Sequence, residues 1–228
     1  MAPRKFSEPT DRILGTRPVE VRRYGAFIRV NHWFGAICFV LLMLSGFALF
    51  HPSFFGLTAL FGGGQTTRWI HPFLGIALVI SFAAMFIQLV RLNILRREDL
   101  VWTAHIADVI TGHEERLPEL GKYNFGQKVV FWGMFWLILA LVATGIPMWV
   151  QYFPDLVSIP TRRIAILIHS ISAVLIVLVF ILHVFAALWT RGTIRAMTRG
   201  TVTGGWAWLH HRKWLRELAG RRGTNAAE

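Results

Sequence analysis

Four long apolar runs constrain this chain of 228 residues more than any other feature of its sequence. A helix needs about 20 residues to cross the ~30 Å of hydrocarbon in a bilayer, and each run is at least that long. Only helices and closed barrels satisfy their backbone groups in lipid, and the runs lack the two-residue alternation of barrel strands. The sequence therefore predicts an all-α membrane protein, a bundle of four transmembrane helices at roughly 30–50, 70–90, 129–150 and 164–189.

The distribution of basic residues predicts how this bundle is oriented. The net charge is +12, and the basic residues concentrate before the first run, in the loop 91–128 and after the fourth run. By the positive-inside rule, the N- and C-termini and the middle loop of this multi-pass membrane protein face the cytoplasm. Because this rule explains the charge better than nucleic-acid binding does, we expect membrane lipids as partners and no nucleic acid.

The same charge pattern divides the chain into three segments. We expect a polar basic N-terminal arm at 1–25, the four-helix domain at 26–200 and a basic tail at the cytoplasmic surface at 201–228. The first apolar run begins too late and is too long for a signal peptide, so we expect it to be retained as a span.

Four histidines lie inside the apolar runs, where an imidazole is costly unless it has a partner. Depth pairs His71 with His169 near the outer side, and His32 with His183 near the cytoplasmic side. A metal cofactor would satisfy all four, and haem fits better than zinc because no carboxylate or cysteine accompanies them. The sequence thus predicts two b-type haems, an outer one held by His71 and His169 and an inner one held by His32 and His183.

The spacing in the fourth run supports this pairing. His169 and His183 are 14 residues apart, which places them ~21 Å apart along a helix and only ~40° apart around it. One helix can therefore offer two ligands to the same interior at two depths.

The alternative of another class is a haem-free membrane anchor or small transporter, in which the histidines are satisfied polar groups or proton carriers. The other five histidines are expected to be solvated or interfacial: His51, His105, His113, His210 and His211.

The loop 91–128 contains two features. Apolar residues at 99–112 recur with helical spacing, which predicts a short helix at the cytoplasmic surface. The octet 121–128, Gly-Lys-Tyr-Asn-Phe-Gly-Gln-Lys, follows just before the third run. Its amide side chains could hydrogen-bond a quinone carbonyl, but from composition alone a capped, polar helix start explains the octet better.

Several segments together resemble a known family. They are 29–33 (Arg-Val-Asn-His-Trp), 68–73 (Arg-Trp-Ile-His-Pro-Phe), the octet 121–128, 167–169 (Leu-Ile-His), 182–183 (Leu-His) and 210–214 with Trp206. In this order they resemble the cytochrome b (gamma) subunit of respiratory membrane-bound formate dehydrogenases, from about residue 29 to 214. The first 21 residues lie outside the resemblance.

The resemblance implies the same two haem b ligand pairs and, beside the inner haem, a quinone site at Asn124, Gly126, Gln127 and His183. It implies menaquinone or ubiquinone as the electron acceptor. The implied partners are an iron–sulfur (beta) subunit with a membrane anchor and a molybdenum or tungsten catalytic (alpha) subunit, so the chain is not expected to oxidise formate alone. The dihaem cytochrome b subunit of a membrane-bound hydrogenase, or of a related reductase, is the nearest alternative.

Overall fold

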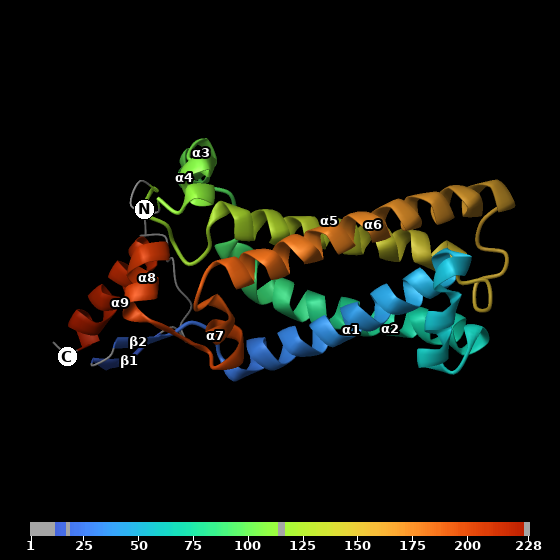
Figure 1. Cartoon of the computed structure of the whole chain (residues 1–228), viewed down its shortest axis with the longest axis horizontal. Coiled ribbons are helices and arrows are strands. Elements are labelled where there is room, and N and C mark those ends of the chain that lie inside the picture. The colour runs from blue at the N-terminus through green and yellow to red at the C-terminus, as the bar shows by residue number, and fades with distance from the viewer. Residues whose placement is uncertain (1–11, 17–18, 114–116, 226–228) are drawn as a thin grey trace. The chain divides into compact units, whose positions relative to one another are not determined.

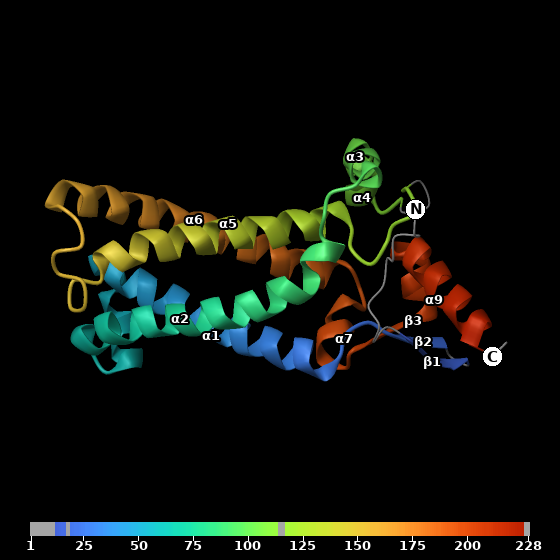
Figure 2. The same cartoon turned by 180° about the vertical axis from the view of Figure 1, so that it is seen from behind.

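The computed structural model describes residues 12–16, 19–113 and 117–225, and most of that chain is helical. Four helices are long and apolar enough to cross a membrane, and they run side by side in both views of the ribbon (Figures 1 and 2). They are α1 (Ala26–Phe50), α2 (Gly64–Leu89), α5 (Phe125–Met148) and α6 (Ile159–Trp189). The predicted number and order of the spans are confirmed.

The chain forms two compact units. The bundle unit comprises residues 31–86 and 130–183, and the end unit comprises the described parts of 1–30, 87–129 and 184–228. Each of the four long helices contributes residues to both units.

The bundle unit packs around an apolar layer halfway along its helices. Phe39 of α1, Ile138 of α5 and Ile176 of α6 are buried at its centre, and the rings of Phe39 and Phe180 stack with centroids 4.7 Å apart. Ile176 lies seven residues from both His169 and His183. The apolar layer therefore separates the two depths at which the histidines were predicted to pair.

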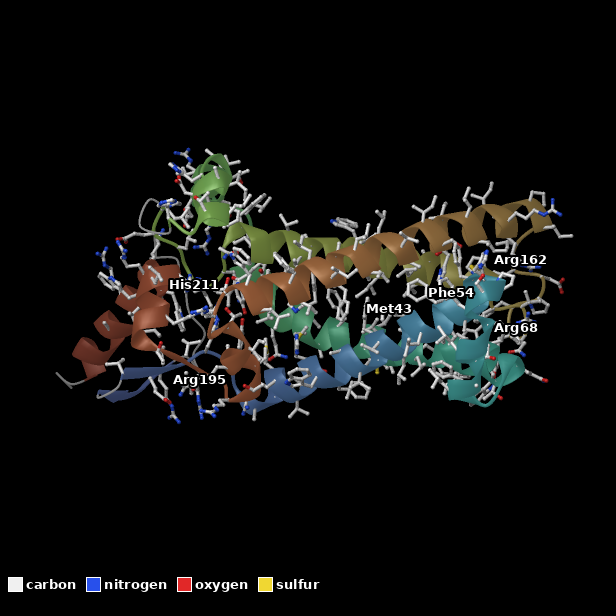
Figure 3. All side chains as sticks on the ribbon, viewed as in Figure 1. Met43, Phe54, Arg68, Arg162, Arg195 and His211 are labelled. Carbon is white, nitrogen blue, oxygen red and sulfur yellow. The ribbon has the colours of Figure 1, made fainter. Side chains whose placement is uncertain are left out.

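Short segments close the end of the bundle unit that was predicted to be the outer one. The 3-10 helix η1 (Pro52–Phe61) joins α1 to α2 and is capped by His51, whose side chain accepts a hydrogen bond from the backbone of Ser53. Arg162 of α6 donates to the carbonyl oxygen of Pro147 in α5 (3.1 Å) and to that of Pro154 in the connecting loop (2.6 Å). Figure 3 shows Arg162 and Arg68 at the same end of the bundle.

The end unit contains the short elements. After the 3-10 turn η2 (Val90–Leu92), the middle loop forms α3 (Arg97–Ala104) and α4 (Ile106–Thr111). The tail forms α7 (Thr193–Thr198), strand β3 (Thr201–Thr203), α8 (Gly204–His210) and α9 (Arg212–Asn225). The single surface helix predicted at 99–112 is thus two helices, because His105 leaves the helical conformation between them.

A small sheet was not predicted from the sequence. Strands β1 (Arg12–Thr16) and β2 (Val19–Arg22) form a hairpin, and β3 adds to it in the antiparallel order β1-β2-β3. Val21 pairs with Val202, so the N-terminal arm and the C-terminal tail meet in one sheet. Figure 2 shows this sheet beside α9. The predicted arm at 1–25 includes residues 1–11, 17 and 18, which lie outside the described part of the chain.

A buried arginine joins the arm, the octet and the tail. Arg23 is 2 % exposed, and its guanidinium lies 5.0 to 5.6 Å from the ring centres of four aromatic residues. Those residues are Tyr24, Tyr123, Trp206 and Trp214. The guanidinium also donates to the carbonyl of Lys122, and the Lys122 ammonium donates to the carbonyl of Arg23 at 2.7 Å. Desolvated cation–π contacts of this kind stabilise by ~2 kcal/mol or more.

His211 belongs to the same cluster, so the prediction that it is solvated or interfacial was wrong. It is 1 % exposed, and its Nδ1 lies 2.7 Å from the carbonyl oxygen of Gly121. Burial, and next the positive charge of Arg23, hold the pKa of this imidazole well below its ordinary value. The same two causes lower the pKa of His210 to about 4. Both rings are therefore neutral at physiological pH, and Nδ1 of His211 carries the proton that it donates to Gly121.

Candidate functional site

The structure brings the four predicted histidines together in two pairs within the bundle unit. His71 of α2 and His169 of α6 have ring centres 6.5 Å apart, with their planes at 64°. His32 of α1 and His183 of α6 have ring centres 6.1 Å apart, with their planes at 50°. These are the pairs expected from depth, and α6 contributes one ring to each.

Both separations fit a metal held between two imidazoles. Two nitrogen–metal bonds of about 2 Å, with about 1 Å from each nitrogen to its ring centre, put the ring centres about 6 Å apart. Within residues 12–16, 19–113 and 117–225, no group of three or more His, Cys, Asp and Glu could hold a metal ion. Paired imidazoles without further protein ligands suit haem iron, because the macrocycle supplies the other ligands.

The pairs keep the names outer (His71 and His169) and inner (His32 and His183) from the sequence prediction. The outer pair is held by hydroxyl groups from the two other long helices. Nδ1 of His71 lies 2.8 Å from Oγ of Ser45 on α1, and Nδ1 of His169 lies 3.0 Å from Oγ1 of Thr144 on α5. Hydrogen bonds to the distal nitrogen fix the orientation and tautomer of a metal-binding imidazole. Both outer rings are therefore oriented with Nε2 as the nitrogen that can bind iron.

A glycine follows each of these hydroxyl residues and keeps space beside the ring. A Cβ at Gly46 would lie 3.6 Å from Cε1 of His71, and one at Gly145 would lie 3.4 Å from Cε1 of His169. A larger side chain at either position would fill the space next to the imidazole. The dipeptides Ser45-Gly46 and Thr144-Gly145 thus form matching cradles for the outer pair.

The inner pair has different surroundings. Nδ1 of His32 is buried and has no hydrogen-bond partner among the described residues. Beside it, the Asn31 amide donates to the Ser81 carbonyl at 2.8 Å, and the Ser81 hydroxyl donates to Asn31 Oδ1 at 3.0 Å. A Cβ at Gly35 would lie only 2.9 Å from the Ser81 hydroxyl oxygen. The small residue at 35 therefore allows a polar link between α1 and α2 next to His32.

In the end unit, three of the four predicted quinone residues, Asn124, Gly126 and Gln127, lie at the start of α5. The backbone N–H of Gln127 donates to Oδ1 of Asn124 at 2.9 Å, and the backbone N–H of Asn124 donates to Oε1 of Gln127 at 3.1 Å. Because backbone N–H groups only donate, both facing atoms have to be the amide oxygens. This reciprocal capping box leaves the two side-chain NH2 groups as hydrogen-bond donors.

Gly126 lies inside this turn and is closely surrounded. A Cβ at this position would lie 3.5 Å from both Oδ1 of Asn124 and the ring of Trp102. His183, the fourth residue of the predicted quinone site, belongs to the bundle unit, and its contribution to that site stays a prediction.

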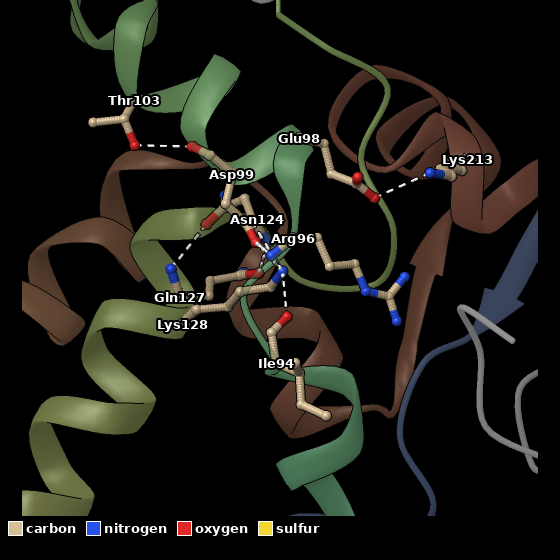
Figure 4. A network of polar contacts seen from close by, with 9 residues as sticks. All are labelled: Ile94, Arg96, Glu98, Asp99, Thr103, Asn124, Gln127, Lys128 and Lys213. Atoms are coloured by element: carbon tan, nitrogen blue, oxygen red, sulfur yellow. Dashed lines mark hydrogen bonds and ion pairs between the residues drawn. The ribbon is translucent and has the colours of Figure 1, made fainter. Parts of the chain in front are cut away.

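A buried ion pair fixes this turn to the surface helix α3 (Figure 4). The ammonium of Lys128 lies 2.6 and 2.9 Å from the two carboxylate oxygens of Asp99 and donates to the carbonyl of Ile94 at 3.2 Å. Both side chains are at most 3 % exposed. Asp99 also accepts a hydrogen bond from the backbone N–H of Arg96 at 2.6 Å. All three ammonium protons of Lys128 thus have acceptors, so its role is to hold the turn in place.

Sequence reasoning found the histidines and the amides but missed the residues that hold them. Ser45, Thr144 and Ser81 are hydroxyl residues inside apolar runs, and Ser45 and Thr144 lie at the depth of the histidines that they contact. That shared depth was the available signal. It was weak because Ser and Thr in membrane helices commonly bond only to their own backbone.

The chain is similar to known proteins over most of its length. A family model described as prokaryotic cytochrome b561 matches residues 23–200. The chain is 40 % identical over 196 residues to the formate dehydrogenase cytochrome b556(fdo) subunit of Escherichia coli K12, covering 86 % of this chain and 92 % of the relative. It is 41 % identical over 189 residues to the formate dehydrogenase cytochrome b556 subunit of Haemophilus influenzae, covering 83 % and 79 %.

The nitrate-inducible formate dehydrogenase cytochrome b556(Fdn) subunit of Escherichia coli K12 is 37 % identical over 190 residues, with 83 % of this chain and 88 % of the relative covered. The resemblance drawn from the histidine motifs and the octet is confirmed by these similarities.

Proposed function

Because the chain belongs to the prokaryotic cytochrome b561 family, we propose that it is the membrane electron-transfer subunit of a bacterial formate dehydrogenase. It carries electrons from an iron–sulfur subunit on the outer side of the inner membrane to a quinone near the cytoplasmic side. The observation that carries this proposal is the presence of two imidazole pairs at two depths of one bundle. The assignment to formate dehydrogenase in particular is supported by relatives of that name, whose sequences match most of the chain.

The four histidines would hold two b haems. His71 and His169 would bind the outer haem, and His32 and His183 the inner one. Each haem, when bound, supplies a reversible one-electron carrier. The chain's own residues bind and orient it: the imidazoles provide axial ligands, the Ser45 and Thr144 hydroxyls fix the outer rings, and the apolar layer around Ile176 separates the two sites.

The partners follow from the same proposal. Formate oxidation belongs to a molybdenum or tungsten catalytic subunit, and an iron–sulfur subunit with a membrane anchor delivers the electrons. Both termini of the chain face the cytoplasm, as the distribution of basic residues predicts.

The start of α5 would bind the quinone. Asn124 Nδ2 and Gln127 Nε2 are donors without a protein acceptor in the described chain, and both are positioned by the capping box. The N-terminus of α5 adds the positive end of a helix dipole. Such a turn favours an oxygen that gains negative charge, as the carbonyl oxygen of a menaquinone or ubiquinone does on reduction.

The variants Asn124→Asp and Gln127→Glu test this site sharply. Both keep the oxygen that closes the capping box, while the NH2 donor is replaced by a carboxylate oxygen. In the purified complex, formate should still reduce the haems at the normal rate, but haem reoxidation by added quinone should slow by about tenfold or more, as expected for one lost hydrogen bond of 1–3 kcal/mol. Normal reoxidation in both variants would remove these amides from the site.

The choice of substrate has its own test. Formate should reduce the haems of the complex as purified, whereas hydrogen should not. Reduction by hydrogen alone would instead support a hydrogenase cytochrome b subunit, and a colourless complex would support a haem-free anchor.

A further inference from the structure

The two outer histidines share an arrangement that the inner pair does not repeat. Each outer imidazole meets a hydroxyl from the long helix that precedes its own, Ser45 for His71 and Thr144 for His169. Ser45 is fully buried and Thr144 is 9 % exposed, so water does not compete for these hydrogen bonds. Two independent helix pairs thus provide the same contact to one predicted haem.

The positions of the hydrogens follow from counting donors. The Ser45 hydroxyl lies 2.8 Å from the carbonyl oxygen of Leu41, and the Thr144 hydroxyl lies 2.6 Å from that of Ala140. A carbonyl oxygen only accepts, so each hydroxyl proton goes to its own helix. The hydroxyl oxygen is then an acceptor, and the imidazole Nδ1–H donates to it. The His169 ring has the backbone carbonyl of Leu141 as a further acceptor.

A ring that donates from Nδ1 is a stronger ligand at Nε2. The hydrogen bond draws the Nδ1 proton away from the ring, which raises the basicity of the ligating nitrogen. A more basic axial ligand stabilises ferric over ferrous iron, so the reduction potential of the haem falls. His32 of the inner pair lacks this effect, because its buried Nδ1 has no acceptor in the described part of the chain.

We propose that Ser45 and Thr144 lower the reduction potential of the outer haem without changing that of the inner haem. The two hydroxyls thereby favour the passage of each electron from the outer to the inner haem. This inference rests on the haem ligands given under the proposed function. Ser45 and Thr144 would thus help to set the difference in reduction potential between the two haems.

The test removes the hydroxyls and measures the two haems separately. The complex is prepared with Ser45→Ala, with Thr144→Val, which preserves the side-chain shape, and with both substitutions. Redox titration of the reduced-minus-oxidised spectrum should resolve two transitions. The transition of one haem should move to higher potential, further in the double variant than in either single variant, while the other transition stays in place.

Thr67→Val is the matched control. Thr67 is fully buried near the outer end of α2, and its hydroxyl donates to the carbonyl of Gly63 at 2.8 Å. No imidazole is among its hydrogen-bond partners in the described residues. The potentials of both haems should be unchanged in this variant. The exchanges Ser45→Thr and Thr144→Ser keep a hydroxyl and should retain the original potentials.

Three results would overturn the proposal. The first is that neither transition moves in the double variant while both haems remain bound. The second is an equal shift of both haems. The third is loss of the outer haem in Ser45→Ala and Thr144→Val but not in Ser45→Thr, because the hydroxyls would then be needed for assembly. A wild-type complex that lacks one or both haems contradicts the ligand assignment itself and is recognised before any variant is made.

Discussion

At the scale of single residues, a histidine inside a membrane helix has two ring nitrogens to satisfy where water is absent. In the outer pair, each Nδ1 has a hydroxyl partner, and the two rings face one another at 6.5 Å. That leaves one nitrogen on each ring for a shared metal. Packing alone does not explain two imidazoles whose ring centres lie 6.5 Å apart and whose Nδ1 atoms are both taken by hydroxyl groups.

Removing one outer ligand gives a prediction specific to that pair. His71→Ala or His169→Ala should lower the haem content from two to one per chain, because the inner pair uses other residues at a separate depth. Pyridine haemochrome measurement on the purified complex gives the ratio. His113→Ala, at an exposed position of the end unit, is the control and should keep both haems. Equal loss of both haems from a still-folded variant would contradict the pairing.

The sequence predicted these ligands because histidine is rare and costly in an apolar run, so its position alone carries information. It did not predict the hydroxyl partners, since Ser45 and Thr144 also bond to their own helix backbones and need no tertiary contact. The capped, polar helix start that composition favoured for the octet is confirmed by the capping box of Asn124 and Gln127. The sequence marked the amides but did not show that their oxygens were already used.

At the scale of elements, the ion pair between Asp99 and Lys128 joins α3 to the first turn of α5. Removing one member of a buried pair costs about 3–5 kcal/mol, because an uncompensated charge stays buried. Lys128→Met should therefore speed amide hydrogen exchange throughout α3, while the double variant Asp99→Asn with Lys128→Met, which removes both charges and keeps an acceptor for the Arg96 N–H, should restore much of the protection. Equal protection in the wild type and in Lys128→Met would show that the pair does not hold α3.

The tail elements give a pH-dependent prediction. Burial and Arg23 lower the pKa of His210 to about 4 and that of His211 well below 6.5 in the folded protein. In the unfolded tail both rings titrate near 6.5, so below this pH the unfolded state takes up protons that the folded state does not. Stability of α8 and α9 should fall as the pH drops from 6.5 toward 4, and should not change through these groups above pH 7.

Amide exchange over residues 204–225, corrected for the intrinsic effect of pH, measures this loss. The variant His211→Phe removes one of the two titrating rings and should show a smaller dependence. Equal stability of the tail at pH 7 and pH 5 would contradict the burial of neutral histidines there.

The small sheet shows why the tail could not be predicted from the sequence. Its strands have three to five residues, too few for a clear alternation, and β3 pairs with a strand about 180 residues earlier. Gly200 makes the connection possible with a φ of 80°, and a Cβ there would lie 2.7 Å from the carbonyl oxygen of Tyr24. In the sequence, a single glycine before a strand of three residues does not indicate such a contact.

At the scale of the whole molecule, one chain carries two sites at different depths of a membrane bundle. The four spans were predictable because a run of about 20 apolar residues is typical of a transmembrane helix. The pairing of histidines was predictable because depth along a helix follows directly from residue number. The fold of the end unit could not be predicted, because its elements are short and are held by contacts between the arm, the octet and the tail.

The most direct test of the central claim is the haem content of the intact, gently extracted complex after reduction with formate. Two b-type haems per chain, both reduced by formate and both in the low-spin state of bis-imidazole iron, is the expected result. A complex with a single haem would remove one of the histidine pairs from the proposed route, and a colourless one would leave the chain without a role in electron transfer.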